Sequence, residues 1–384
     1  MRELTPLYYI TSAALPTPKA GSVQVMQMCA GLATQTETTL VLPRAVQPQP
    51  AASLLSHYDV PASFAVLRLP RRAHAHLWRL HAVRHVHRQQ GSAWLCYARG
   101  RDVLAAWLAL QLGARAIFEV HGRPASWLEL RLLRSVAAHA RGQLVAISAE
   151  LAAVYGRAYG IPAERFFIAA DAVTLARFTP QMQRDEARSA CGLAPSGRYA
   201  VYTGSLYPGR GLEVLFAAMR SQSAQLVVVG GGAASEVQHW RSIAVAAGVP
   251  DAIFTGYQSP ARIPHYLQAA DVLLMPYGTR TLTPSGENTT AFMSPLKMFE
   301  YMAAARPIVA TDLPALRGTL RHEHNALLVA PDAEAPLAAA IARVLADSGL
   351  AARLAAAARA DVEPLTWEAR ARTVLARVGQ VVQG

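Results

Sequence analysis

The chain has 384 residues, of which 52% are hydrophobic, so it is long enough for two domains that each bury a core. Its formal net charge of +12 and pI near 10.0 indicate an anionic partner, for which nucleic acid, a lipid surface and a phosphorylated substrate all qualify. Cys29, Cys96 and Cys191 are scattered and lack the spacing of a metal motif, which argues against a disulfide framework and a structural zinc site.

The first half of the chain alternates short apolar runs with helical patterns, which is typical of a parallel sheet covered by helices. Strands are predicted at 7–10, 38–42, 63–69, 94–97, 116–120, 144–148 and 166–170. Helices are predicted from Ser22, over 102–112 and over 150–159. Gly21 lies in the loop between the first strand and its helix, where a phosphate or a sugar can bind.

The segment from Arg71 to Arg88 is rich in arginine and histidine and is predicted to be a helix. Its apolar residues recur at helical spacing: Leu77, Leu80 and Val83. We interpret it either as a solvated basic helix or as one that lies on anionic lipid headgroups. His81 and His85 are one turn apart, but no carboxylate accompanies them, so no metal is expected. Nucleic acid is not expected either, because aromatic residues do not alternate with the charges.

His121 directly follows the strand predicted at 116–120. In an open α/β sheet, ligands collect at the carboxyl ends of the strands, so this histidine is a better functional candidate than one on a helix face. The alternative is a structural role, which is more common for a lone histidine.

The second half of the chain restarts the same pattern after a hinge predicted between Asp171 and Pro180. A strand at 199–203 leads through the glycine-rich loop 204–211 into a helix at 212–219. Glycines let the backbone approach a ligand closely, and Arg210 can clamp a phosphate through its planar guanidinium. Further strands are predicted at 226–229, 253–257, 272–275 and 326–329, and further helices at 263–270, 336–345, 350–362 and 367–382.

The stretch from Ser294 to Asp312 combines a helix and a strand with an unusual order of charges. Ser294 is predicted as the N-cap and Pro295 as the first helical residue. Core-facing residues are expected at Leu296, Phe299, Met302 and Ala303, and a strand at 308–310. Free N–H groups at the helix start, followed by Lys297 and then Glu300, would suit a diphosphate with a ribose beyond it. The alternative is a core helix on which Lys297 and Glu300 form an exposed ion pair.

This stretch resembles the donor-binding segment of GT-B glycosyltransferases of the family 4 type, and the resemblance covers most of the chain. It implies an α/β fold of two Rossmann-like, doubly wound domains facing a cleft. The acceptor-side domain would span 1–175, the donor domain 176–366, and a terminal helix at 367–384 would cross back to the first. The Ser-Pro-Leu-Lys start resembles a subgroup that lacks the first of two glutamates; Phe292 stands at that position, and Glu287 is a candidate substitute.

The same resemblance implies roles for individual residues. Arg210 and Lys297 would stabilise the leaving diphosphate, and His121 would approach the transferred sugar. Glu300 would bind the ribose hydroxyls, and Tyr257 would lie near the base. The other donor-binding positions are Gly21, Gly204, Ser205, Ser294, Pro295 and Leu296.

The implied activity is that of a retaining, metal-independent glycosyltransferase without a cofactor, which uses a UDP- or GDP-linked sugar and a polysaccharide, lipid-linked or small-molecule acceptor. Two alternatives remain open: a nucleotide-sugar epimerase and a non-catalytic nucleotide-sugar-binding subunit of a polysaccharide assembly complex. The first residues show no signal peptide, and no apolar run reaches the roughly 20 residues of a membrane span. A cytoplasmic protein is therefore expected, which the segment from Arg71 to Arg88 would hold on the inner face of the membrane.

Overall fold

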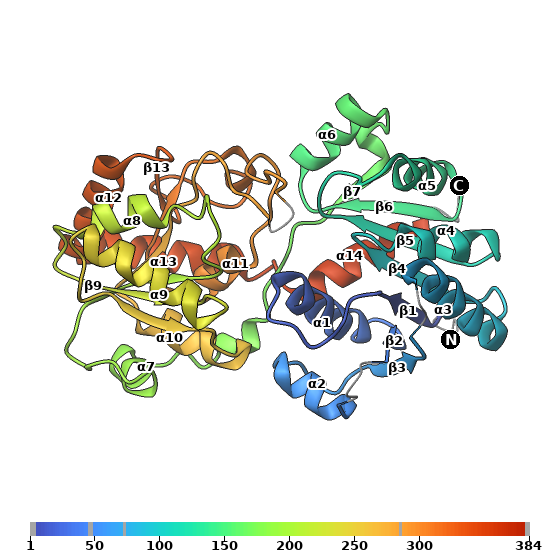
Figure 1. The fold of residues 1–384 in the computed structure, drawn as a ribbon, viewed down its shortest axis with the longest axis horizontal. Coiled ribbons are helices and arrows are strands. Elements are labelled where there is room, and N and C mark those ends of the chain that lie inside the picture. The colour runs from blue at the N-terminus through green and yellow to red at the C-terminus, as the bar shows by residue number, and fades with distance from the viewer. Residues whose placement is uncertain (1–4, 45–48, 72–73, 284–285, 381–384) are drawn as a thin grey trace. The chain divides into compact units, whose positions relative to one another are not determined.

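The computed structural model describes residues 5–44, 49–71, 74–283 and 286–380 (Figure 1). The chain forms two compact units. Unit 1 comprises residues 1–171 together with 367–384, and unit 2 comprises residues 172–366. The chain enters and leaves unit 2 side by side, because the Val173 N–H donates to the Leu365 carbonyl at 3.0 Å.

Unit 1 is built on a seven-stranded sheet in the order β3-β2-β1-β4-β5-β6-β7, with parallel neighbours throughout. Its strands are β1 (Leu7–Ile10), β2 (Thr38–Pro43), β3 (Ala65–Leu69), β4 (Leu95–Arg99), β5 (Arg115–Val120), β6 (Gly142–Ala146) and β7 (Phe166–Ile168). These strands confirm the predicted ones to within a few residues. The strand order reverses between β1 and β4, and in such sheets the crevice beyond the carboxyl ends at this point is where ligands bind.

The helices of unit 1 are α1 (Ala20–Ala33), α2 (Ala51–His57), α3 (Ala75–Gln90), α4 (Val103–Gln111), α5 (Trp127–Ala138), α6 (Ala149–Tyr159) and α14 (Trp367–Gln380). Helices α2 and α5 were not predicted. For α5 the sequence carried a signal, since Ser126 and Glu129 have the spacing of a capping box. The Ser126 hydroxyl accepts from the Glu129 N–H at 3.2 Å, and the Glu129 carboxylate accepts from the Ala125 N–H at 2.9 Å.

The helix predicted in the basic segment corresponds to α3, but two details of the prediction were wrong. Leu77 is 51% exposed, and the predicted Val83 is buried together with Trp78, Ala82 and Val86, which were not predicted. Arg79 does not contribute to a basic surface, because it is buried and pairs with Asp102 at 2.6 Å. Arg72 lies outside the described residues. The described parts of the chain contain no group of three potential metal ligands.

The terminal helix α14 belongs to unit 1 and contacts α1, as predicted. A Cβ atom on Gly31 of α1 would lie only 2.5 Å from the carbonyl oxygen of Trp367, so the two helices meet where a side chain does not fit. Within the described residues no single helix has the length and apolarity of a membrane span. The helices α12 (Glu334–Ala346) and α13 (Ser348–Val362) reach that length and apolarity only together, and this pair is bent by 100°.

Unit 2 repeats the design with a six-stranded parallel sheet in the order β10-β9-β8-β11-β12-β13. Its strands are β8 (Tyr199–Thr203), β9 (Gln225–Val229), β10 (Ile253–Gly256), β11 (Val272–Met275), β12 (Ile308–Thr311) and β13 (Leu327–Val329). Besides α12 and α13, its helices are α7 (Arg184–Ala190), α8 (Leu212–Met219), α9 (Ala234–Ala246), α10 (Ile263–Ala269) and α11 (Leu296–Ala303). Helices α7 and α9 were not predicted.

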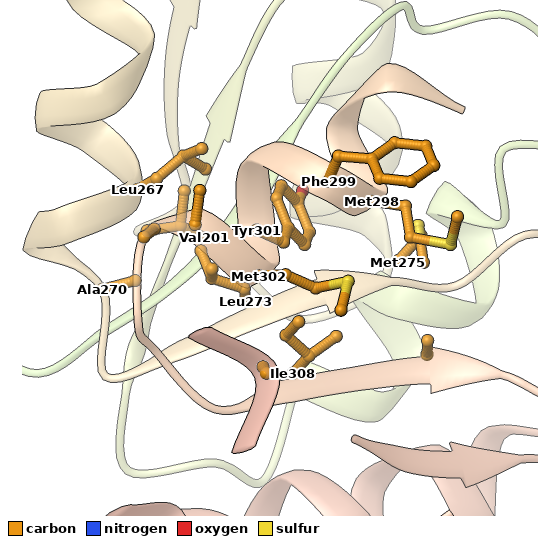
Figure 2. Close-up of a cluster of buried hydrophobic side chains, with 14 of the residues drawn as sticks. Val201, Leu267, Ala270, Leu273, Met275, Met298, Phe299, Tyr301, Met302 and Ile308 are labelled. Carbon is orange, nitrogen blue, oxygen red and sulfur yellow. The ribbon is translucent and has the colours of Figure 1, made fainter. Parts of the chain in front are cut away.

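Helices cover both faces of this sheet, because alternate residues of one strand belong to different cores. Val201 of β8 packs in the core that contains α10 and α11, whereas its neighbour Tyr202 packs with α8, α9 and α12. Figure 2 shows Tyr301 and Met302 of α11 among the first of these clusters, next to Ile308 of β12. The core therefore holds α11 over the middle of the sheet, where the strand order reverses between β8 and β11.

The contact between α1 and α14 gives a test of the fold. Gly31→Ala should lower the free energy of unfolding by about 2 kcal/mol, because the new methyl group overlaps the Trp367 carbonyl. Gly379→Ala is the matched control, since a Cβ there meets nothing within 4 Å, and it should leave stability unchanged or raise it by about 0.5 kcal/mol. Urea unfolding measures both, and equal effects would contradict this packing.

Candidate functional site

Helix α11 begins at Leu296, so the predicted N-cap at Ser294 was wrong. Pro295 occupies the N-cap position in an extended conformation (φ −78°, ψ 125°), and its carbonyl accepts the first bond, from the Met298 N–H, at 2.9 Å. A proline also disfavours helical geometry in the residue before it, which explains why Ser294 stays outside. Pro295 makes no side-chain hydrogen bond to the N–H groups of the first turn, and free N–H groups at a helix start attract anions.

A buried tyrosine hydroxyl ties α11 to the carboxyl ends of two strands. The Tyr301 hydroxyl accepts from the Thr203 N–H of β8 at 2.8 Å and donates to the Leu274 carbonyl of β11 at 3.2 Å. Tyr301 lies one helical turn after Lys297, and Thr203 directly precedes Gly204. This bond therefore places the Lys297 turn against the glycine-rich loop.

The Nζ atom of Lys297 is buried against that loop. Its Nζ has no hydrogen-bond partner among the described residues and lies 4.0 Å from the ring centre of Tyr202 and 5.0 Å from that of Tyr277. A Cβ on Gly204, whose φ of +136° already favours glycine, would lie 2.7 Å from Nζ. Burial, helped by the charge of Arg210, lowers the pKa of Lys297 well below its usual value. The predicted alternative, an exposed Lys297–Glu300 pair, was wrong.

Arg210 provides a second cation at the same place. Its guanidinium carbon lies 5.4 Å from the ring centre of Tyr277, the ring that Lys297 also faces. Its Nε is buried and has no hydrogen-bond partner in the described parts of the chain. The two side chains are close enough that the charge of Arg210 lowers the pKa of Lys297, and a bound anion would offset this repulsion.

Glu300 is paired with a residue that the sequence did not identify. Its Oε1 accepts from Arg177 Nη1 at 3.0 Å, with the two side chains 18% and 7% exposed. Arg177 lies in the predicted hinge, in the short 3-10 helix Leu175–Phe178, and also donates to the Pro260 carbonyl. No local motif marks this arginine, because its partner is 123 residues away.

The remaining residues predicted in unit 2 lie at the same edge of its sheet or next to it. Tyr257 follows β10 and is 43% exposed, while the Ser205 carbonyl accepts from the Tyr202 hydroxyl at 2.8 Å. Phe292 is buried in the core, and Glu287 lies in the loop between β11 and α11. The role suggested for Glu287 stays a prediction.

Unit 1 has its own polar centre at the carboxyl end of β5. His121 Nε2 is hydrogen-bonded to Glu119 Oε1, and the His121 side chain is 19% exposed. Burial, with the charge of Arg99, lowers the pKa of His121 to about 4, so the ring is neutral at pH 7. Arg99 also donates to the Gly21 carbonyl at 2.6 Å, which places the predicted Gly21 at this centre.

Glu119 is fully buried, and sequence reasoning gave it no role. Its carboxylate is contacted by Gln24 Nε2 at 2.8 Å, by Arg370 Nη2 at 3.0 Å and by the Tyr97 hydroxyl. Burial acts to raise the pKa of Glu119, but Arg370 and His121 outweigh it and hold the pKa well below the usual value. Arg370 comes from α14, far along the chain, which explains why the sequence did not indicate this pair.

The geometry of unit 2 agrees with a comparison to known families. Residues 197–347, which include β8 to α12, match the profile of the family described as Glycosyl transferases group 1. Within unit 2, residues 197–347 are thus similar to a group 1 glycosyltransferase domain.

The similarity to curated relatives covers more residues than this match. The chain is 29% identical over 233 residues to a D-inositol 3-phosphate glycosyltransferase of Jonesia denitrificans, covering 57% of this chain and 52% of that protein. It is 27% identical over 303 residues to a GDP-mannose-dependent alpha-(1-6)-phosphatidylinositol monomannoside mannosyltransferase of Mycobacterium tuberculosis, covering 76% of each. The chain thus spans about half the length of the D-inositol 3-phosphate glycosyltransferases that it matches.

Several solved structures share the fold of the chain. A glycosyltransferase from Rickettsia africae has a TM-score of 0.77 at 13% identity and covers 99% of both chains. HepE from Anabaena in complex with UDP has a TM-score of 0.74 at 16% identity, covering 98% of this chain and 100% of that one. The two Rossmann-like sheets therefore belong to a GT-B-like fold.

The low pKa of His121 makes stability depend on pH in a defined direction. Between pH 6.5 and about 4 the unfolded chain binds a proton at His121 and the folded chain does not, so unfolding becomes easier as the pH falls. His121→Gln keeps a donor for Glu119 and cannot titrate. Relative to this variant, the wild type should lose on the order of 2 kcal/mol of unfolding free energy between pH 7.5 and 5. Urea unfolding at both pH values measures this, and a pH-independent difference would argue against a neutral His121.

The unpaired cation of Lys297 makes the ligand-free protein less stable than it would otherwise be. Lys297→Met keeps the aliphatic contact with Tyr202 and removes the buried charge, so it should raise the free energy of unfolding by about 1–2 kcal/mol in the absence of ligand. Arg343→Met is the control, because Arg343 is 50% exposed and should change stability little. Destabilisation by Lys297→Met would contradict this account.

Proposed function

We propose that this protein is a retaining glycosyltransferase that moves a sugar from a nucleoside diphosphate sugar to a hydroxyl of a glycan, lipid-linked or small-molecule acceptor, without a metal. The observation that carries the proposal is the buried Nζ of Lys297, which lacks a hydrogen-bond partner within the described residues. Arg210 Nε, which lies nearby, is also buried and lacks a hydrogen-bond partner among the described residues. Buried cations of this kind are typical of sites where an anionic ligand completes the charge balance.

The diphosphate would lie between Gly204 and the first turn of α11. There Lys297 and Arg210 would offset the negative charge that grows as the bond from the sugar C1 to the phosphate oxygen breaks. A bond forms from C1 to the acceptor oxygen on the same face, and the acceptor proton passes to the leaving diphosphate. This sequence needs no protein nucleophile, so the contribution of the chain is binding, orientation and electrostatic stabilisation.

The nucleoside would lie along α11 and beyond β10. Arg177 occupies Glu300 Oε1, so the ribose hydroxyls would bind to the other carboxylate oxygen. Tyr257 is exposed enough to stack on a base. A UDP- or GDP-linked donor is supported by the UDP complex of HepE and by the GDP-mannose named for the mycobacterial relative.

The acceptor and the cellular location are also part of the proposal. Arg71, Arg84 and Arg88 are exposed in the segment around α3, whereas Arg79 is buried. Exposed arginines of this kind would hold a cytoplasmic enzyme on an anionic membrane, where lipid-linked acceptors are found.

Thermal unfolding with UDP, GDP, ADP and CMP tests the donor site. One diphosphate should raise the melting temperature selectively, because a ligand that binds only the native state stabilises it by mass action. Lys297→Met and Glu300→Ala should each reduce the shift at a fixed ligand concentration, and Arg343→Met should not. If none of the nucleotides shifts the wild type, the proposed function is wrong.

A turnover assay separates the enzyme from a non-catalytic nucleotide-sugar-binding subunit. UDP-glucose and GDP-mannose are incubated with the protein and free diphosphate is measured with and without a lipid-linked acceptor extract. An enzyme should release diphosphate, and Arg210→Ala should lower kcat far more than it weakens nucleoside binding. Selective nucleotide binding without turnover of any donor would instead support the binding subunit.

A further inference from the structure

The donor atom of each hydrogen bond to Glu119 can be deduced from the chemistry of its partners. An ionised carboxylate only accepts hydrogen bonds, so each of its neighbours has to donate. Gln24 donates through its amide nitrogen, Tyr97 through its hydroxyl and Arg370 through its guanidinium. Gln24 and His121 share Oε1, while Tyr97 and Arg370 share Oε2.

His121 contacts this carboxylate through Nε2, so Nε2 carries the ring proton. A neutral imidazole has one proton, and Nδ1 is therefore a bare acceptor. Among the described residues Nδ1 has no hydrogen-bond partner, although the side chain remains 19% exposed. The ring thus presents an unused lone pair at the carboxyl edge of the sheet.

We propose that Glu119 is a positioning residue that holds His121 as the Nε2–H tautomer, so that Nδ1 accepts a hydrogen bond from a hydroxyl group of the bound substrate. The substrate contact rests on the proposed function, whereas the tautomer does not. His121 then contributes as an acceptor that orients a hydroxyl, and not as a general acid.

The rest of the centre explains why Glu119 can do this. Its charge is balanced by Arg370 of α14. The Arg370 guanidinium is held in place because it donates hydrogen bonds to the carbonyls of Ala169 and Ala170, at 3.1 and 2.7 Å. The other ionisable groups acting here are Arg99 and Asp171, and burial raises the pKa of Asp171 to about 7. A helix that lies far along the chain therefore sets the charge state of the carboxylate and, through it, the tautomer of His121.

Nitrogen NMR of the whole protein labelled with ¹⁵N-histidine tests the tautomer without any ligand. The His121 signals are those that disappear in His121→Gln. At pH 7 they should show a protonated Nε2 and a pyridine-type Nδ1. A protonated Nδ1, or a doubly protonated ring, overturns the proposal whether or not the protein is an enzyme.

Two variants separate positioning from general structural support. Glu119→Gln places an amide next to Nε2 that can accept or donate, so the tautomer should become mixed. Tyr97→Phe removes a donor from Oε2 and leaves Oε1 untouched, so the His121 signals should keep the wild-type pattern. Equal changes in both variants overturn the proposal, and the wild-type spectrum decides alone if Glu119→Gln fails to fold.

The substrate contact has its own readout. On addition of UDP-glucose or GDP-mannose, the pyridine-type Nδ1 signal should move toward lower frequency, as it does when a lone pair accepts a hydrogen bond. Glu119→Gln should lower kcat at least tenfold and leave the affinity for the free diphosphate unchanged. If nucleotides bind but no donor moves the Nδ1 signal, the substrate contact is wrong while the donor site stands; if no nucleotide binds, the proposed function fails first.

Discussion

The requirement to keep Glu119 charged inside the protein governs the arrangement of unit 1. A carboxylate that is fully buried is tolerated only where donors saturate it and a cation balances it. Those donors come from α1, β4, the turn after β5 and α14. Four elements have to meet at one point, so the sheet, the first helix and the terminal helix are mutually fixed at the carboxyl edge where His121 lies.

At the corresponding edge of unit 2, by contrast, the charged side chain of Lys297 has no hydrogen-bond partner among the described residues. Tyr301 anchors α11 to the strands, and the turn before it holds Lys297 against Gly204 without a carboxylate partner. Glu300, the acid one turn after Lys297, is paired with Arg177 instead. The described residues of unit 1 therefore balance the charge of Glu119, whereas those of unit 2 leave Lys297 Nζ and Arg210 Nε without a hydrogen-bond partner, which the proposed diphosphate would supply.

The sequence predicted those features that depend on neighbouring residues. Strands such as Tyr199–Thr203 and Val272–Met275 were predicted because they are apolar on both faces, and the Lys297 turn because it follows a proline at a helix start. Helices α7 and α9 were missed because their faces are largely polar. The partners of Glu300 and Glu119 were missed for another reason: Arg177 and Arg370 are distant in the chain, and no local pattern encodes a contact that only the folded sheet creates.

The division of unit 1 by the insertion of unit 2 has a consequence for synthesis on the ribosome. Unit 2 is one continuous segment, 172–366, and is complete before α14 has been made. Until then, the surface of α1 around Gly31 is uncovered and Glu119 lacks its cation. Since domains fold as they emerge, the segment made first is the last to reach its native state. Between the synthesis of residue 366 and that of α14, a nascent chain therefore carries a complete unit 2 together with a unit 1 whose α1 surface at Gly31 is still uncovered.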